Sequence, residues 1–176
     1  MALRMFQPAR ILLGGHSRFV AAVTTPVQRL VFVCAGNICR SPFGEYLARR
    51  GGVPAISMGL HATTGSVANP VAVRHAQSHG IDLQPHRATL FSADSLRESD
   101  LVIGFELLHL QALEHAVAGR RIQLRLLGGF LGLGSYHIHD PYGLHEEYFA
   151  SCFSTIKRAT DALTSKVKIR LDTETQ

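Results

Sequence analysis

The residues with the clearest capacity for chemistry are Cys34 and Arg40, a thiol and a guanidinium separated by five residues. A thiol at the mouth of a loop whose backbone N–H groups point inward is favoured as a thiolate, the nucleophilic form. The five intervening residues are enough for the loop to curl around a tetrahedral oxyanion. The planar guanidinium of Arg40 can then bind two phosphate oxygens at once. The spacing predicts a phosphate-binding site with a thiol nucleophile at its centre.

The residues around this pair are expected to shape the anion site. Gly36 lets the backbone approach the anion closely, and Asn37 tolerates a positive φ and can brace the loop from within. Ser41 can donate a hydrogen bond to the thiolate and help it to leave in a second step. A lone cysteine here would more simply be a small buried residue at the end of a strand. The prediction of a site therefore depends on the other loop residues being present at the right spacing from Cys34. The predicted phosphate-binding loop comprises Ala35, Gly36, Asn37, Ile38, Cys39 and Ser41.

The segments on either side of the loop must position it. Residues 30–33 are a short apolar run, typical of a strand buried on both faces of a parallel sheet. Ser41 is expected to be the N-cap of a helix, with Pro42 as its first residue and residues 51–52, both glycine, as its end. The thiol would thus lie between the end of a strand and the N-terminus of a helix, where anions bind.

The rest of the chain alternates between short apolar runs and amphipathic segments, a pattern that requires a parallel sheet with helices on both faces. We therefore predict a single three-layer α/β domain over residues 29–168, with a four-stranded parallel sheet and the phosphate loop after its first strand. Ligands bind beyond the carboxyl ends of the strands in such sheets, where Cys34 falls. Further strands are expected at residues 55–58, 101–104 and 122–127, and further helices at 70–79, 106–117 and 144–167.

Composition limits the other classes of function. Four of the 18 basic residues and none of the 13 acidic residues lie in residues 1–29, so the rest of the chain is nearly neutral. With no basic stripe and no tryptophan, nucleic-acid binding has little support. No run of 18 apolar residues is present, so no membrane span is expected. Residues 1–28 are predicted to be a basic, poorly ordered arm that superficially resembles an organelle transit peptide, and residues 169–176 a polar tail.

The cysteines and histidines suggest free thiols and no metal. Three cysteines are too few for a disulfide scaffold, and an odd number suits a reducing compartment, so we expect a cytoplasmic protein. His137 and His139 flank one residue beside Asp140, a spacing that could suggest a metal site. No fourth ligand accompanies them, and we expect neither a metal nor another cofactor.

The stretch VCAGNICRSPFGE closely resembles the signature of the low-molecular-weight protein tyrosine phosphatases, and the resemblance extends over residues 30–163. It implies a phosphomonoester hydrolase that removes phosphate from protein phosphotyrosine through a cysteinyl-phosphate intermediate, without a metal. A phosphotyrosyl protein is the implied partner, and a bacterial tyrosine kinase is a candidate substrate by family analogy alone. The segments that carry the resemblance outside the loop are Ser57-Met58-Gly59, His79-Gly80-Ile81, His86-Arg87-Ala88, Leu126-Leu127-Gly128-Gly129-Phe130 and Asp140-Pro141-Tyr142-Gly143.

The resemblance also implies a role for each site residue. Cys34 is the nucleophile, Arg40 stabilises the transition state, and Asp140 protonates the leaving group. An Asp-Pro turn without catalytic duty is the alternative for Asp140 taken alone. Tyr142 would form one wall of the substrate cleft, and Cys39 would be the redox partner of Cys34. The residues expected to hold the loop in shape are Asn37, Ser41, Ser57 and His86.

Departures from the family bear on substrate choice. Residues 61–65 contain no aromatic residue, which leaves one wall of the cleft open and bears on strict phosphotyrosine selectivity. Ile38 stands where protein arginine phosphatases of the same fold carry threonine, and it favours an ester substrate. Arsenate reductases need further redox cysteines, and none lies between Cys39 and Cys152. A phosphate-reading module with little turnover remains the alternative from another class.

Overall fold

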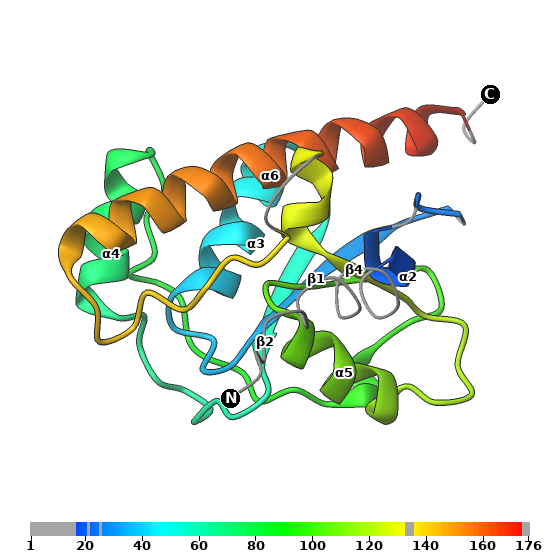
Figure 1. Ribbon diagram of the computed structural model, residues 1–176, viewed down its shortest axis with the longest axis horizontal. Helices are drawn as coiled ribbons and strands as arrows, with labels where there is room; N and C mark the ends of the chain where they lie inside the picture. The colour runs from blue at the N-terminus through cyan, green and yellow to red at the C-terminus, as the bar shows by residue number, and fades with distance from the viewer. Residues whose placement is uncertain (1–16, 21, 25, 133–135, 174–176) are drawn as a thin grey trace, which may run out of the picture.

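The core of the protein is a four-stranded parallel sheet, seen in a computed structural model that describes residues 17–20, 22–24, 26–132 and 136–173 (Figure 1). Its strands are β1 (Arg29–Cys34), β2 (Ala55–Gly59), β3 (Asp100–Gly104) and β4 (Gln123–Leu126). They lie in the order β2-β1-β3-β4, and every neighbouring pair is parallel. The predicted α/β architecture, with the phosphate loop after the first strand, is confirmed.

The central strand β1 explains why its sequence is apolar throughout. Side chains alternate between the two faces of a strand, so residues of both parities are buried only when both faces are covered. Leu30 and Phe32 belong to one hydrophobic core, and Val31 and Val33 belong to the other. All four side chains are fully buried. The continuous apolar run is therefore the signature of a strand between two layers of helix.

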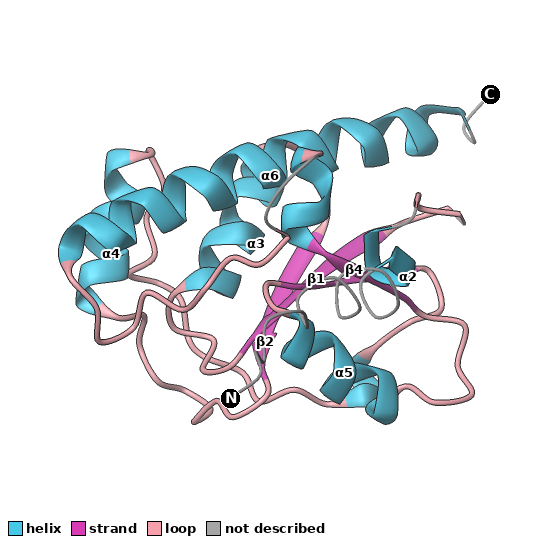
Figure 2. Ribbon diagram, in the orientation of Figure 1, coloured by secondary structure: helices cyan, strands magenta, loops and turns pink. Residues whose placement is uncertain are grey.

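The helices form these two layers (Figure 2). One face of the sheet is covered by α3 (Arg40–Arg50), α4 (Pro70–Ser78) and the long α6 (Glu146–Thr173). The other face is covered by α5 (Leu107–Ala116), with the short 3₁₀ segment η1 (Ala93–Ser95) preceding β3. A second 3₁₀ segment, η2 (Leu127–Leu131), follows β4 directly and packs against α6.

Helix α3 begins earlier than the sequence predicts. Its N-cap is Cys39 rather than Ser41, and Pro42 is its third residue rather than its first. The reason is that the Ser41 hydroxyl turns inward toward Cys34 and takes no part in capping. Helix α6 also differs, since it continues to Thr173 and includes residues 169–173 of the predicted polar tail.

The described part of the predicted N-terminal arm packs on the domain, while residues 1–16, 21 and 25 lie outside the described residues. The short helix α2 (Ser17–Val20) lies against β4, the edge strand on this side of the sheet. Phe19 joins the core on the α5 face, and Val23 joins the core on the α6 face. This segment therefore covers an edge of the sheet, one of the ways in which proteins protect an edge strand from pairing with another chain. Among the described helices, none is both long enough and apolar enough to cross a membrane.

The packing of α6 on α3 gives a prediction for stability. The rings of Phe43 and Phe153 stack with their centroids 4.3 Å apart, and both are fully buried. We expect Phe153→Ala to lower the free energy of unfolding by about 3–5 kcal/mol, because it removes buried area and leaves a cavity. Urea denaturation followed by circular dichroism measures the change. The control is Leu108→Ala at an exposed position of α5, which should alter stability by less than about 0.5 kcal/mol.

Candidate active site

The predicted nucleophile Cys34 is the last residue of β1, and helix α3 starts at Arg40 after a loop of five residues. The backbone N–H of Asn37 donates to Cys34 Sγ at 3.3 Å. Ser41 Oγ lies 3.1 Å from the same sulfur atom, and either atom can be the donor. A backbone donor, a hydroxyl and a helix N-terminus thus converge on one thiol. These contacts fix the position of the sulfur atom at the mouth of the loop.

Asn37 is the brace of the loop. It is fully buried and has a φ of +55°, in the left-handed region that asparagine tolerates better than most residues. Its side-chain Nδ2 donates to Ser41 Oγ and to Ser57 Oγ, each at 2.8 Å. Its Oδ1 accepts from the backbone N–H of Thr89 at 2.8 Å. One side chain therefore connects the loop to α3, to β2 and to the segment before β3.

Two further groups complete this polar network beneath the loop. His86 Nε2 lies 2.7 Å from the carbonyl oxygen of Asn37. Ser57 Oγ donates to Glu45 Oε2 at 2.7 Å, and Glu45 is buried on α3. Sequence reasoning missed Glu45. The available signal was its place four residues after Ser41 on the predicted helix, which puts both side chains on the same helix face.

The end of β2 closes against the backbone of the loop. The Cα of Gly59 is the register partner of Cys34 in the sheet. A Cβ at Gly59 would lie 2.8 Å from both the carbonyl oxygen of Ala35 and the backbone nitrogen of Asn37. Neither backbone atom can move without deforming the loop. Glycine is therefore required here by close approach.

Arg40 is buried and surrounded by acceptors. Its Nη2 donates to Asp140 Oδ2 at 2.6 Å, and its Nη1 donates to the carbonyl oxygen of Ile138 at 2.9 Å and to the Glu106 carboxylate. Burial alone would lower the pKa of Arg40, but the negative charges of Cys34, Asp140 and Glu106 outweigh it and raise that pKa. The guanidinium is thus permanently charged and fixed in orientation.

Glu106 and His109 hold this arrangement from behind, and sequence reasoning missed both. Glu106 is the N-cap of α5 and forms a reciprocal capping box with His109, whose Nδ1 accepts the Glu106 N–H at 3.3 Å. Burial raises the pKa of Glu106, but the bond from Arg40 outweighs it and lowers the pKa overall. Burial, together with the charge of Arg40, lowers the pKa of His109 to about 4. The signal for the pair was an acidic residue three positions before a histidine at a helix start.

Asp140 reaches the site from the loop between η2 and α6. Its Oδ1 accepts from the backbone N–H of Tyr142 at 3.2 Å, so the Asp-Pro turn exists together with the contact to Arg40. The loop is anchored where Ile138 N–H donates to the carbonyl oxygen of Phe105 at 2.8 Å. The Asp140 side chain is 43% exposed, so it remains open to the cavity.

These groups surround a cavity of about 220 Å³ at the carboxyl end of β1. Tyr142 lines it and is exposed, and His61 lines it from the loop after β2, where no aromatic wall was expected. Burial is the largest cause that raises the pKa of Cys39, so Cys39 is a protonated thiol at neutral pH. Cys34, Cys39 and Cys152 are all free. The lining residues are Cys34, Ala35, Gly36, Ile38, Cys39, Arg40, His61, Asp140 and Tyr142.

Comparison with known proteins places this geometry in a family. The sequence model of the family described as "Low molecular weight phosphotyrosine protein phosphatase" matches residues 29–173. A probable low-molecular-weight protein-tyrosine-phosphatase, EpsP of Ralstonia solanacearum, is 31% identical over 147 residues, which are 81% of this chain and 97% of EpsP. The crystal structure of the tyrosine phosphatase AmsI of Erwinia amylovora is 30% identical, covers 81% of this chain and 94% of its own, and has a TM-score of 0.72. The tyrosine phosphatase Wzb of Escherichia coli K30, in complex with sulphate, is 32% identical, with 80% and 99% covered and a TM-score of 0.72.

The low pKa of His109 predicts a pH dependence of stability. As the pH falls from about 6.5 to about 4, the unfolded chain binds a proton at this side chain that the folded chain does not bind. Folded-state stability is therefore lost progressively in that window, by up to about 3 kcal/mol from this residue. Urea denaturation at several pH values should show a shallower decline for His109→Asn than for the wild type. His115→Asn, at an exposed position of the same helix, should follow the wild type; a decline for His109→Asn as steep as the wild type's contradicts the assignment.

Proposed function

This chain belongs to the low-molecular-weight phosphotyrosine protein phosphatase family, and we propose that it hydrolyses protein phosphotyrosine with Cys34 as nucleophile, Arg40 as anion clamp and Asp140 as proton donor. The observation that carries the assignment of roles is that these three side chains line one cavity of about 220 Å³. They come from the end of β1, the start of α3 and the loop before α6. Their convergence supplies a nucleophile, an electrophilic clamp and an acid within one small space.

In the first step the Cys34 thiolate attacks phosphorus. The S–P bond forms while the bond from phosphorus to the phenolic oxygen breaks, and Asp140 in its acid form gives its proton to that oxygen. Tyrosine leaves, and phosphate remains on Cys34. The loop N–H groups and the guanidinium of Arg40 stabilise the charge on the equatorial oxygens.

In the second step water replaces the thiol. The Asp140 carboxylate removes a proton from water while the water oxygen bonds to phosphorus and the S–P bond breaks. The hydroxyl of Ser41, 3.1 Å from the sulfur, stabilises the departing thiolate by a hydrogen bond. Inorganic phosphate is released, and Cys34 and Asp140 return to their starting protonation states.

Glu106 acts as a positioning residue in this mechanism. It binds Nη1 of Arg40 together with the carbonyl oxygen of Ile138, which leaves Nη2 directed toward Asp140. A phosphate oxygen entering between Arg40 and Asp140 competes for Nη2. The guanidinium then keeps its orientation because Nη1 is still held. Fixing a flexible side chain in this way avoids loss of entropy in the transition state.

The rim favours an aryl ester. Ile38 and Tyr142 give the cavity apolar walls suited to a flat phenol ring, and His61 adds a planar imidazole. The family analogy extends to a tyrosine kinase as the physiological substrate. The catalytic thiol must stay reduced, and the cytoplasm is the compartment that ensures this.

Two substitutions test the catalytic roles with phosphate esters that differ in their leaving group. Cys34→Ser should reduce hydrolysis of para-nitrophenyl phosphate to background. Asp140→Asn should reduce kcat for phenyl phosphate by about a hundredfold or more, because phenolate needs the proton. The loss should be smaller for para-nitrophenyl phosphate, whose leaving group is less basic. A wild-type protein no faster than Cys34→Ser would leave only a phosphate-reading module, and equal losses for both esters would exclude Asp140 as the acid.

Substrate preference is tested by matched peptides that carry phosphotyrosine, phosphoserine or phosphoarginine at one position. We expect kcat/KM for phosphotyrosine to exceed the other two on the order of a hundredfold, because only a long aromatic ester places phosphorus at Cys34 while packing on Tyr142. Tyr142→Ala should reduce this preference, and Tyr148→Ala, at an exposed position of α6, should not. Faster hydrolysis of phosphoarginine would show a protein arginine phosphatase instead.

A further inference from the structure

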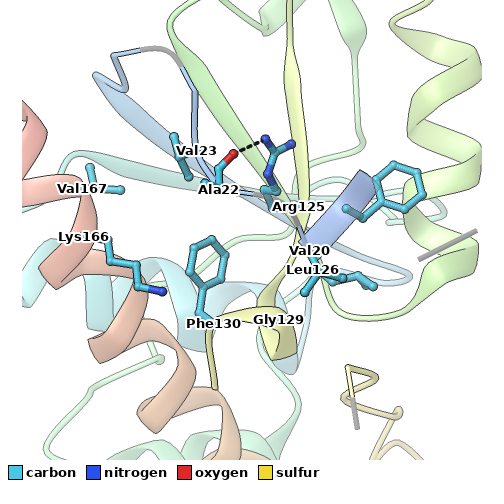
Figure 3. Close-up of a pocket in the computed structure, with 10 residues that line it drawn as sticks. Val20, Ala22, Val23, Arg125, Leu126, Gly129, Phe130, Lys166 and Val167 are labelled. Atoms are coloured by element: carbon cyan, nitrogen blue, oxygen red, sulfur yellow. Dashed lines mark hydrogen bonds between the residues drawn. The ribbon is translucent and has the colours of Figure 1, made fainter. Parts of the chain in front are cut away.

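A second and larger cavity lies away from the active site, between the N-terminal segment, β4 with η2, and α6 (Figure 3). Its volume is about 350 Å³, within the range of small-molecule binding pockets. Among the residues that the structure describes, none lines both this cavity and the cavity that contains Cys34. Four of its lining residues, in the stretch 19–23, precede the part of the chain that matches the family model. The cavity is thus a feature outside the reaction described above.

The walls of the cavity are apolar. Val20 and Val23 face it from the N-terminal segment, Leu126 and Phe130 from β4 and η2, and Val167 from α6 (Figure 3). The segment closes tightly on η2, since a Cβ at Gly129 would lie 2.7 Å from Val20 Cγ1. An apolar body of a ligand would therefore lose contact with water on several sides.

Two cations lie among these walls, and no acidic side chain is found among the described lining residues. Lys166 places its ammonium 5.4 Å from the centroid of the Phe130 ring, on the α6 side. Arg125 is buried, and its Nη2 donates to the carbonyl oxygen of Ala22 at 2.7 Å, which ties the N-terminal segment over the cavity (Figure 3). Its Nη1 donates to the carbonyl oxygen of Leu124 at 2.8 Å, so backbone carbonyl groups fix the position of this cation in the cavity wall.

We propose that this cavity binds a small amphipathic anion, with its apolar body against Phe130 and Val23 and its anionic group beside Lys166 and Arg125. Apolar walls provide the affinity, and the two cations determine the sign of the charge that is accepted. A neutral or cationic molecule of the same shape would gain only the part of the binding free energy that comes from apolar contacts.

The probe is octanoate, compared with octan-1-ol and octylammonium, which share its alkyl chain. Isothermal titration of the wild-type protein should show saturable binding of one octanoate, with weaker binding of octanol and the weakest of octylammonium. Because the chain contains no tryptophan, Phe130→Trp introduces a single fluorescent reporter in the cavity wall. Its emission should change with octanoate at the same midpoint.

Charge variants then test the role of Lys166. Lys166→Gln should weaken octanoate binding about threefold and Lys166→Glu about tenfold, as expected for one exposed ion pair and its reversal. Arg158→Glu makes the same change in net charge as Lys166→Glu, but at an exposed position of α6 outside the cavity. It should leave the affinity for octanoate unchanged. Hydrolysis of para-nitrophenyl phosphate should be unaffected in every variant, because none of these residues lines the active site.

Three results would overturn the proposal. Equal affinity for octanoate and octanol would show that the cations play no part. The absence of saturable binding would show that the cavity is not a ligand site. Concentration-dependent dimerisation without octanoate binding would show that a second copy of the chain covers this surface.

Discussion

The buried positive charge of Arg40 is the constraint on which the active site depends. Burying a single charge costs several kcal/mol unless partners surround it. Those partners come from three places in the fold: Cys34 at the end of β1, Glu106 after β3, and the loop that carries Ile138 and Asp140. Because the strands are parallel and β1 lies beside β3, these partners of Arg40 lie together at the carboxyl ends of the strands. The charge that binds phosphate is therefore also the charge that holds these segments together.

A second constraint is that the polar groups beneath the loop satisfy one another. Asn37 binds Ser41 and Ser57, and Ser57 in turn binds Glu45. Buried networks of this kind are stable only when each member has its partners, because an unsatisfied polar group in a low-dielectric interior is costly. The loop therefore has little freedom to adopt another shape. Its donors are oriented before the substrate arrives, which is the basis of electrostatic preorganisation.

Much of the structure could be predicted from local patterns in the sequence. The apolar run of β1, the spacing from Cys34 to Arg40 and the alternation of elements predicted the sheet and the position of the loop. Glu106 was missed because its importance arises from contact with Arg40, more than 60 residues earlier in the chain, and no local period encodes that contact. His109 was missed with it, because His109 acts through its capping box with Glu106. The N-cap of α3 was misplaced because Ser41 has a stronger partner in Cys34. The packing of residues 17–20 on β4 could not be predicted from the sequence either, because it depends on which strand lies at the edge of the sheet.

The close approach of Gly59 to the loop has an evolutionary consequence. The backbone of Ala35 and Asn37 leaves no room for any side chain at that position, so the residue of β2 nearest to the active-site loop cannot be substituted. Two residues further along, His61 is exposed. Tyr142, which lines the same cavity, is exposed as well. Substitution at these rim positions alters what enters the cavity without disturbing the thiol or the guanidinium. Substrate range can thus diverge between descendants of such a protein while the catalytic step is inherited intact.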